Sequence, residues 1–466
     1  MREGFFLSEM VRIIQGELLQ VPVTRSNLFI PASKLCTDTR IIGKGELFVA
    51  LKGENFNGND FVEDACKKGA LGAIVDEFNR DVPSEFLIIR VKNTLKALHL
   101  LAKSYREKLG LTLIGITGSN GKTTVKELTA SILSQRYRVT RSLGNFNNQI
   151  GVPLSILQFS PQDQIGILEI GMNQLGEIKI LSEIVQPQIG IITNVHRAHI
   201  GFLGSLEEIA RAKAEMIPFL NRDSENILIL NQDDPWTCYF QKRAICRVFT
   251  FGVNSDADFK GLKVKMKGEK TEFDFVFPGG ESITFCLPFP GFFNVYNTMA
   301  AAAVGYLLGI SPVKIKESVE SFSLPPLRSR VEKWKDLTFF IDCYNANPES
   351  TRSALLTLKN LKGERKIAVL GDMLELGEFS QELHEEIGKI AASLRIDALF
   401  TCGKFSFHTL KGANKAGLKE CFYFENKEDL AKTLAGYLKS GDCVLIKGSR
   451  KMQMEDIIPE LKGMRT

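Results

Sequence analysis

The segment LTLIGITGSNGKTTVKELTASIL (Leu111–Leu133) combines a β-branched strand, a glycine-rich turn and a helical pattern in immediate succession. Gly118 and Gly121 allow the backbone to turn tightly with its N–H groups pointing inward. The helix that follows adds about half a positive charge at its N-terminus. The segment therefore predicts a nucleotide phosphate site in an α/β domain.

The loop is G-x-x-G-K-T, which is shorter than the usual phosphate loop because Ile116 stands where a first glycine is common. Lys122 can reach the β- and γ-phosphates, and the hydroxyl of Thr123 can bind Mg²⁺ between them. A strand-to-helix turn with a surface lysine is the alternative, which the flanking strand and helix disfavour. The residues predicted to hold the phosphates are Gly118, Ser119, Asn120, Gly121, Lys122, Thr123 and Thr124.

Outward from this loop, the chain is predicted to be α/β with three domains. After residue 109, the short apolar runs LTLIGIT, IGILEIG, IGIITNV and ILILNQ alternate with helical stretches, which is typical of a mostly parallel sheet covered by helices. Residues 258–290 are expected to add antiparallel strands. We predict a small α/β module over 1–108, a central phosphate-loop domain over 109–326, and a doubly wound, Rossmann-like domain over 327–466 after Pro325-Pro326.

Composition excludes several classes of protein. Lys+Arg 59 against Asp+Glu 54 leaves a net charge of +5 without a run of five like charges, so nucleic-acid binding is not expected. The nine cysteines form no C-x-x-C pair, which argues against a disulfide framework and a thiolate zinc site. No uncharged apolar window approaches eighteen residues. We expect a cytoplasmic protein without a membrane span.

A second group of polar residues is predicted beyond the same sheet edge. Glu169 ends one apolar run, and His199 follows another. Lys213 shares a helical face with Leu206, Ile209, Ala210 and Ile217, so its ammonium must find a carboxylate, lose its proton or be modified. We predict that Glu169, His199 and Lys213 converge on a second Mg²⁺. The alternative is an ordinary strand-end carboxylate at Glu169, a loop histidine at His199 and a surface lysine at Lys213 with its charge in water. His196 is assigned no role.

Several blocks, in the family's order and over essentially the whole chain, resemble the Mur ligases. They are the phosphate loop, Glu169, N-V-x-x-A-H (Asn194–His199), A-K-x-E (Ala212–Glu215) and G-x-x-N-x-x-N-x-x-A (Gly291–Ala300). The resemblance implies an ATP-dependent ligase of peptidoglycan precursor synthesis that joins an amino acid or dipeptide to the peptide of UDP-N-acetylmuramic acid. It also implies two Mg²⁺ ions and a carbamylated lysine at Lys213.

Within the family, GNFNNQIGVPLS (Gly144–Ser155), DCYNANPES (Asp342–Ser350) and GDMLELGEFSQELH (Gly371–His384) are similar to the branch that adds D-alanyl-D-alanine to UDP-N-acetylmuramoyl-tripeptide through an acyl phosphate. KGSR (Lys447–Arg450) near the end matches too. DTR (Asp38–Arg40) resembles a uridine-binding module, and the DNPR signature of the diaminopimelate-adding branch is missing.

The resemblance also implies roles for further residues. Asn294 and Asn297 share a helical face, and Asn297 would contact adenine. Arg330, Asp342 and Asn345 would bind ATP, and the substrate would meet Thr39, Arg40, Asn145, Asn147 and Asn148. We expect a monomer. The alternatives are a related ligase that adds a diamino acid, a phosphate-loop switch or binding ATPase, and a kinase.

Overall fold

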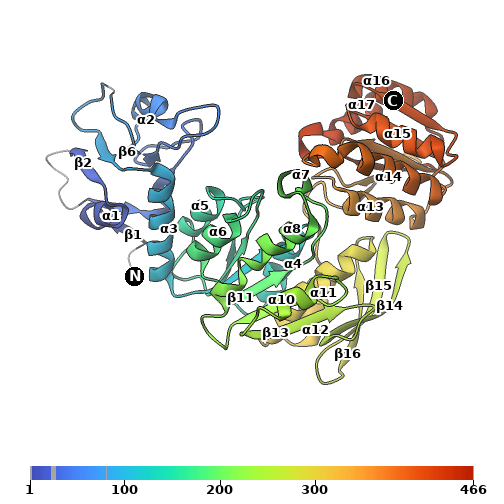
Figure 1. Cartoon of the computed structure of the whole chain (residues 1–466), viewed down its shortest axis with the longest axis horizontal. Coiled ribbons are helices and arrows are strands. Elements are labelled where there is room, and N and C mark those ends of the chain that lie inside the picture. The colour runs from blue at the N-terminus through green and yellow to red at the C-terminus, as the bar shows by residue number, and fades with distance from the viewer. Residues whose placement is uncertain (1–2, 22–27, 80, 465–466) are drawn as a thin grey trace.

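The computed structural model describes residues 3–21, 28–79 and 81–464. It contains three sheets of five, nine and six strands and one two-stranded ribbon. Figure 1 shows the three sheets with their helices following one another along the molecule, from the N-terminal part in blue to the C-terminal part in red. None of the helices in the described part of the chain is long and apolar enough to cross a bilayer.

The N-terminal sheet has the strand order β2-β7-β6-β5-β4, in which β2 alone is antiparallel to its neighbour. Its strands are β2 (Glu17–Gln20), β4 (Leu35–Cys36), β5 (Leu47–Val49), β6 (Gly72–Val75) and β7 (Leu87–Arg90). The helices α1 (Leu7–Ile14) and α2 (Val62–Lys67) lie beside it, and β1 (Gly4–Phe6) pairs with β3 (Phe29–Pro31). This confirms the small α/β module.

Helix α3 (Thr94–Leu109) connects the first two parts of the chain. It begins where the side chain of Asn93 accepts a hydrogen bond from the Lys96 N–H and ends at Gly110, whose φ is +65°. It packs against α1 on one side and against α5 (Gly151–Leu157) and α6 (Glu177–Val185) on the other. The buried side chains of the two parts therefore form one continuous cluster around α3, and a domain boundary at residue 108 stays a prediction.

The central sheet has the order β16-β15-β14-β13-β12-β11-β8-β10-β9. Strands β8 to β14 pair in parallel, and β15 and β16 add antiparallel pairs, as predicted. The strands are β8 (Thr112–Thr117), β9 (Val139–Arg141), β10 (Ile165–Glu169), β11 (Ile189–Ile192), β12 (Ile227–Asn231), β13 (Arg247–Gly252), β14 (Phe259–Lys267), β15 (Lys270–Val276) and β16 (Ser282–Leu287).

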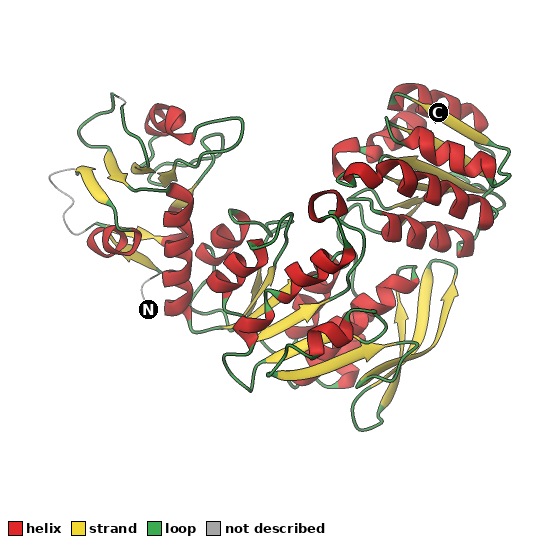
Figure 2. Cartoon of the chain, in the orientation of Figure 1, coloured by secondary structure: helices red, strands yellow, loops and turns green. Residues whose placement is uncertain are grey.

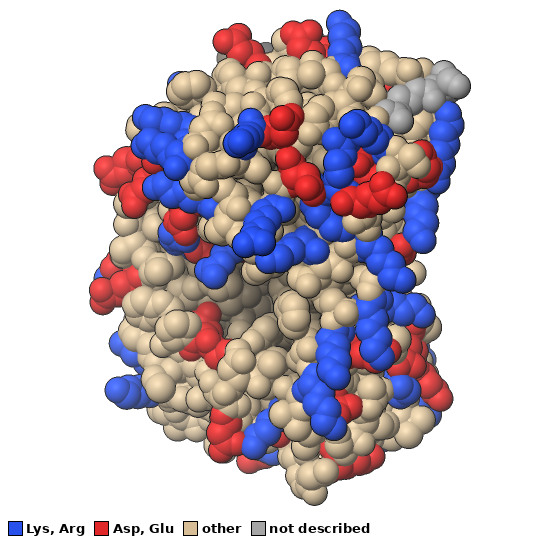
Figure 3. All heavy atoms as spheres, turned by 90° about the vertical axis from the view of Figure 1, so that its right-hand side faces the viewer, with Lys and Arg blue, Asp and Glu red and all other residues tan. Residues whose placement is uncertain are grey.

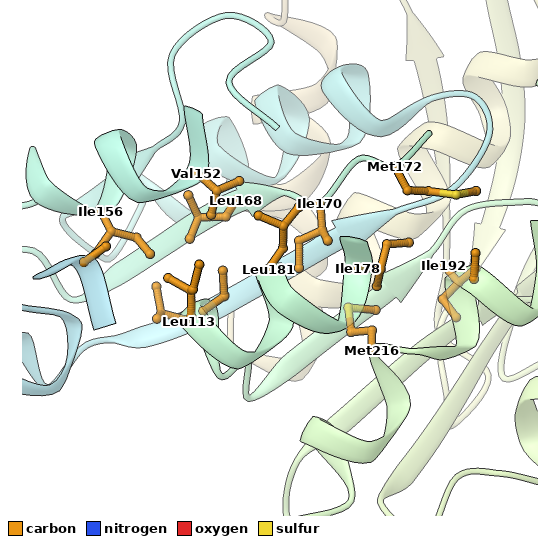
Figure 4. Packing of buried hydrophobic residues seen from close by; sticks show 14 of the residues in the cluster. Leu113, Val152, Ile156, Leu168, Ile170, Met172, Ile178, Leu181, Ile192 and Met216 are labelled. Atoms are coloured by element: carbon orange, nitrogen blue, oxygen red, sulfur yellow. The ribbon is translucent and has the colours of Figure 1, made fainter. Parts of the chain in front are cut away.

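Helices cover both faces of this sheet (Figure 2). One face packs on α4 (Lys122–Leu133), α11 (Phe292–Leu307) and α12 (Pro312–Glu320). The other packs on α5, α6 and α8 (Leu206–Ala214), where Leu113 and Leu168 from the strands lie among Val152, Ile178 and Leu181 from the helices (Figure 4). The short helix α9 (Ile217–Leu220) packs on β11 and β12. The short helix α7 (Ile200–Leu203) lies next to the C-terminal part of the chain, and α10 (Thr237–Gln241) follows β12.

The order of the central strands reverses around β8, which lies between β10 and β11 although β9 and β10 follow it in the chain. The carboxyl ends of these parallel strands meet at one edge of the sheet. Ligands of open α/β sheets bind at such a reversal, outside the carboxyl ends. The fold therefore places the phosphate loop, which follows β8, at this edge.

The C-terminal sheet has the order β17-β18-β22-β19-β20-β21. Its strands are β17 (Arg330–Trp334), β18 (Leu337–Ile341), β19 (Lys366–Gly371), β20 (Ala398–Cys402), β21 (Cys421–Phe424) and β22 (Cys443–Lys447). The helices are α13 (Pro348–Asn360), α14 (Ser380–Ser393), α15 (Ser406–Lys415), α16 (Lys427–Tyr437) and α17 (Ile457–Met464). The doubly wound sheet is confirmed, and the antiparallel pair of β17 and β18 within it was not predicted. The boundary at residue 326 stays a prediction.

Candidate active site

A cavity of about 650 Å³ lies at the carboxyl edge of the central sheet, between that edge and the C-terminal part of the chain. In Figure 3 the molecule is hollowed across its middle, and Lys and Arg side chains lie beside the hollow. Most of the predicted site residues line the cavity: Ser119, Asn120, Gly121, Lys122, Thr123, Thr124, Asn145, Asn147, Glu169, His199, Asn297, Asp342 and Asn345.

The phosphate loop is held against the end of β11. The backbone N–H groups of Ser119 and Asn120 donate to the carbonyl and the side-chain oxygen of Asn194, at 3.0 and 2.9 Å. Gly118 and Gly121 have φ values of +145° and +87°. A Cβ on Gly118 would lie 1.8 Å from Thr193 Oγ1. Only glycine fits there, as the G-x-x-G-K-T pattern requires.

The two cationic side chains nearest the loop are Lys122 and Arg328. Lys122 Nζ donates to the carbonyl of Gly118 at 2.6 Å, and Arg328 Nη2 donates to Thr123 Oγ1 at 2.8 Å. Burial lowers the pKa of Lys122, Glu169 opposes that shift, and Arg328 adds to it. A polyphosphate would supply the anionic partner that Lys122 lacks. Arg328, which also lies 3.8 Å from the ring centre of Tyr344, was missed by the sequence reasoning.

The three residues predicted to hold the second Mg²⁺ differ in their surroundings. Glu169, at the end of β10, is 1% exposed, and its Oε1 accepts no hydrogen bond from any residue that the structure describes. His199, which precedes α7 with a φ of +61°, lies with Nδ1 2.8 Å from Glu375 Oε2. Lys213 does not line the cavity. The structure brings Glu169 and His199 to one cavity, and a shared metal site stays a prediction.

Lys213 is 2% exposed in α8, so its predicted burial is confirmed. Within the described ranges, it forms no ion pair with a carboxylate. Burial lowers its pKa well below the usual value, the charge of Lys122 lowers it further, and Asp234 opposes both. Burial also raises the pKa of Asp234, whose carboxylate accepts from the Val195 and Trp236 N–H groups. The charged form of Lys213 is therefore disfavoured in this environment.

Across residues 3–21, 28–79 and 81–464, no three His, Cys, Asp or Glu side chains gather at metal-ligand spacing. A divalent ion at this edge would therefore need further oxygen donors. The Thr123 hydroxyl, the phosphates of a nucleotide and a carbamate on Lys213 are of the hard type that Mg²⁺ prefers.

The C-terminal part contributes Asp342 and Asn345. The buried Lys447, at the end of β22, lies with Nζ 2.6 Å from Asp342 Oδ2 and donates to the carbonyl of Asn345 at 2.9 Å. Asn347 Nδ2 donates to Asn120 Oδ1 at 2.7 Å. The phosphate loop is thus bonded directly to the N-terminus of α13. Lys447 was predicted only as part of the KGSR motif, and its contact with Asp342 was not predicted.

The cavity lining also excludes Gly118 of the phosphate loop and three other predicted residues of the central and C-terminal parts. Asn294 is buried, and its amide donates to the Pro290 carbonyl and accepts from Asn297, so it orients its neighbour. Asn148 Oδ1 accepts from the Gly151 N–H at 2.8 Å and serves the turn before α5. Arg330 begins the edge strand β17 with its side chain 61% exposed, and Arg328 occupies the cavity wall instead.

Thr39 and Arg40 lie in the N-terminal part, away from this cavity. Arg40 binds Asp38 through its guanidinium, and these hydrogen bonds hold the pKa of Asp38 at about 2. The carbonyl of Thr39 accepts from Lys68 Nζ at 2.6 Å. With its side chain 87% exposed, Arg40 is open to solvent and can exchange Asp38 for another anion.

Three family models match consecutive parts of the chain. They are described as Mur ligase family, catalytic domain (residues 32–106), Mur ligase middle domain (116–305) and Mur ligase, glutamate ligase domain (329–450).

Similar proteins and structures cover nearly the whole chain. The UDP-N-acetylmuramoyl-tripeptide–D-alanyl-D-alanine ligase of Bacillus subtilis is 37% identical over 92% of both chains, and that of Escherichia coli is 33% identical over 98% of both. A MurF structure from Acinetobacter baumannii matches with a TM-score of 0.90, 31% identity and full coverage of both chains. MurF from Thermotoga maritima in complex with ADP matches with a TM-score of 0.82 and 27% identity over 92% of this chain and 97% of that one. These matches, with motifs of the family gathered around one cavity, show that the chain belongs to the Mur ligase family.

Proposed function

We propose that this protein adds D-alanyl-D-alanine to UDP-N-acetylmuramoyl-tripeptide in peptidoglycan precursor synthesis, using ATP and releasing ADP and phosphate. The two relatives described above, which carry the name of this ligase, match the chain over 92% and 98% of its length. One observation carries the proposal. A single cavity joins the phosphate loop at Lys122 and Thr123 to Glu169 and to Asp342 and Asn345 from the C-terminal part.

The chemistry requires two successive attacks. An oxygen of the tripeptide's terminal carboxylate bonds to the γ-phosphorus of ATP while the bond to the β-phosphate oxygen breaks, which gives an acyl phosphate and ADP. The dipeptide amine then attacks the acyl carbon, phosphate leaves, and the amine loses a proton. Because the first step brings two anions together, the site must supply positive charge. Lys122 supplies it on moving from the Gly118 carbonyl to the phosphates, with Arg328 beside Thr123.

We further propose that Thr123, Glu169, His199 and a carbamylated Lys213 hold two Mg²⁺ ions. Such ions, when bound, neutralise phosphoryl oxygens. The buried Glu169 Oε1, which accepts no hydrogen bond from a described residue, and the buried Lys213 amine, which forms no ion pair with a described carboxylate, support this assignment. That amine can bond to the carbon of CO₂ and lose a proton, which turns an unpaired buried lysine into an anionic oxygen ligand.

The domain roles follow the same proposal. Residues 1–108 bind the uridine part of the acceptor, with Thr39 and Arg40 on its surface. Residues 109–326 bind ATP through the phosphate loop, with Asn297 near adenine and Asn145 and Asn147 toward the acceptor. Residues 327–466 bring Asp342 and Asn345 to the nucleotide, take up the dipeptide and close over the cavity, with Pro325–Arg330 as the hinge. Closure excludes water, which would otherwise hydrolyse the acyl phosphate.

We place the enzyme in the cytoplasm as a monomer. All nine cysteines are free thiols, which suits a reducing compartment.

Phosphate release measured with ATP, Mg²⁺ and UDP-N-acetylmuramoyl-tripeptide, with and without D-alanyl-D-alanine, tests the proposal. We expect release that depends on both substrates and a product heavier by one dipeptide residue. Turnover with a diamino acid and the muramoyl dipeptide would indicate the related ligase instead. Phosphate release without any UDP-sugar would indicate a switch ATPase, and a phosphorylated product without free phosphate would indicate a kinase.

A further inference from the structure

Lys126 is a completely buried lysine that does not line the active-site cavity. It lies one helical turn after Lys122 in α4, on the same side of the helix. Its Nζ donates to the carbonyls of Ser142 and Gly144 at 2.7 and 2.9 Å. It also lies 3.2 Å from Glu127 Oε1 and 3.4 Å from Glu169 Oε1. The mechanism above does not use this ammonium.

Burying an ammonium is unfavourable by several kcal/mol unless oxygens replace its lost water. An apolar side chain would fill the same space in α4, next to the buried Val125, without that cost. The oxygens around Lys126 belong to three separate segments: α4, the loop after β9 and the end of β10. The ammonium therefore fixes the positions of these segments relative to one another.

The loop after β9 needs such an anchor. Strand β9 has three residues and lies at the edge of the sheet, so it supports the loop weakly. The loop nevertheless carries Asn145 and Asn147 into the cavity wall and leaves Leu143 and Phe146 exposed. Apart from Lys126, backbone hydrogen bonds tie it to β10 and its end, from Ser142 N to the Ile167 carbonyl and from Gly171 N to the Asn147 carbonyl.

The contact with Glu169 has a different character. At 3.4 Å it is an ion pair without hydrogen-bond geometry, and Glu169 Oε1 accepts no hydrogen bond within the part of the chain that the structure describes. Lys126, which lies outside the cavity, thus compensates the charge of the buried Glu169 carboxylate. The carboxylate's lone pairs stay available on its cavity side. Glu127 is held in turn by Arg141 Nε at 2.7 Å, outside the cavity.

We propose that Lys126 is a positioning residue that couples the acceptor-facing loop to the Glu169 carboxylate. The inference rests on the proposed function. The ammonium holds the backbone at Ser142 and Gly144 so that Asn145 and Asn147 face the acceptor peptide. It also sets the position of Glu169 for a divalent cation. Loss of the ammonium affects the acceptor and Mg²⁺, and leaves ATP binding at the phosphate loop largely intact.

The test compares Lys126→Met and Lys126→Arg with the wild-type protein. We expect Lys126→Met to raise both the KM for UDP-N-acetylmuramoyl-tripeptide and the Mg²⁺ concentration for half-maximal activity by about tenfold, the effect of losing a partner that orients a metal ligand. The KM for ATP should change less than about twofold, since Lys126 donates to the loop after β9 and not to the phosphate loop. Lys126→Arg restores the charge and recovers part of both losses.

Lys108→Met is the matched control. Lys108 Nζ also binds a backbone carbonyl and a carboxylate, those of Gly4 and Glu9, but it lies in α3 away from the cavity. We expect Lys108→Met to leave the KM for UDP-N-acetylmuramoyl-tripeptide and the Mg²⁺ concentration for half-maximal activity unchanged. If Lys126→Met does not fold, Lys126→Met combined with Glu127→Gln removes the buried ammonium together with the partly exposed carboxylate beside it. The acceptor KM and the half-maximal Mg²⁺ concentration are then measured on this double variant.

If Lys126→Met keeps the wild-type KM for the acceptor and the wild-type Mg²⁺ concentration for half-maximal activity, the inference is overturned. Equal rises in the KM values for ATP and for the acceptor, with no recovery in Lys126→Arg, would also overturn it. Such a result would indicate a general loss of structure. The wild-type protein separates the two proposals. If it shows no acceptor-dependent phosphate release, the proposed function fails, whereas an active wild type with an unaffected Lys126→Met removes only the role of Lys126.

Discussion

At the scale of single residues, Lys122 has the clearest consequence. Its ammonium is bonded to the carbonyl of Gly118 in the same loop and is free to turn toward a triphosphate. We expect Lys122→Ala to lower acceptor-dependent phosphate release by about 10³-fold, since a charged donor to the transferring group is lost. Its thermal unfolding should match wild type, because the side chain supports only its own loop. Near-normal turnover would contradict the phosphate-loop assignment.

Lys213 carries the second residue-scale prediction. The buried side chain has no carboxylate partner in the described ranges, so its proposed carbamate is the oxygen ligand that Mg²⁺ needs. We expect Lys213→Ala to be nearly inactive and to regain part of its activity when short-chain carboxylates are added, because they can enter the vacated space. The measurement is phosphate release across a carboxylate titration, with Lys122→Ala as a control that is not rescued. Full activity without rescue would remove Lys213 from the metal site.

The candidate site was partly predictable at this scale. The burial of Lys213 follows from its place on the apolar stripe of α8, and the glycines at 118 and 121 follow from the loop pattern. Which of Arg328 and Arg330 lies in the cavity wall could not be predicted from the sequence. Ser329 between them has a φ of +48°, so the backbone turns there, and tertiary packing decides which arginine meets Thr123.

At the scale of elements, the N-terminus of α13 combines a helix cap with a contact to the phosphate loop. The Asn347 side chain accepts from the Ser350 N–H at 2.9 Å and donates to Asn120 at 2.7 Å. We expect Asn347→Ala to lower the free energy of unfolding by about 1 kcal/mol and to slow turnover. Asn347→Ser keeps a capping oxygen and loses the reach to Asn120. It should unfold like wild type and turn over slowly.

Chemical denaturation and steady-state kinetics on both variants check this prediction. Wild-type turnover in Asn347→Ser would show that the contact with Asn120 has no part in catalysis. A loss of stability in Asn347→Ser equal to that of Asn347→Ala would mean that the serine does not cap α13.

Elements were predicted well wherever local patterns carry the information. The β-branched runs that form β8, β10, β11 and β12 are typical of buried parallel strands, which are apolar on both faces. Strand β17 was missed because RVEKW alternates polar and apolar residues weakly and pairs on one side only, at the edge of its sheet. The shared role of α3 was also hidden, since its two apolar sides meet partners far apart in sequence.

At the scale of the whole molecule, Arg197 connects the central and C-terminal parts. Its guanidinium binds Glu349 in α13 at 2.6 Å and Glu386 in α14 at 2.8 Å. Burial alone would lower the pKa of Arg197, but the hydrogen bonds that it donates to Glu386 and Glu349 raise it above its usual value. Nearby, the Gly201 N–H donates to the carbonyl of Glu375 at 3.0 Å. These contacts hold the C-terminal part over the cavity.

We expect Arg197→Ala to weaken this closure and to expose the acyl phosphate to water. The ratio of phosphate released to amide bonds formed should then rise above one, and the radius of gyration with ATP bound should exceed that of wild type. Lys103→Ala, which removes a surface ion pair with Glu183 at 3.2 Å, is the control and should keep the ratio at one. Phosphate counting with product quantification and small-angle X-ray scattering give the two values. A ratio of one in Arg197→Ala, with an unchanged radius of gyration, would show that other contacts, such as the Asn120–Asn347 hydrogen bond, close the cavity.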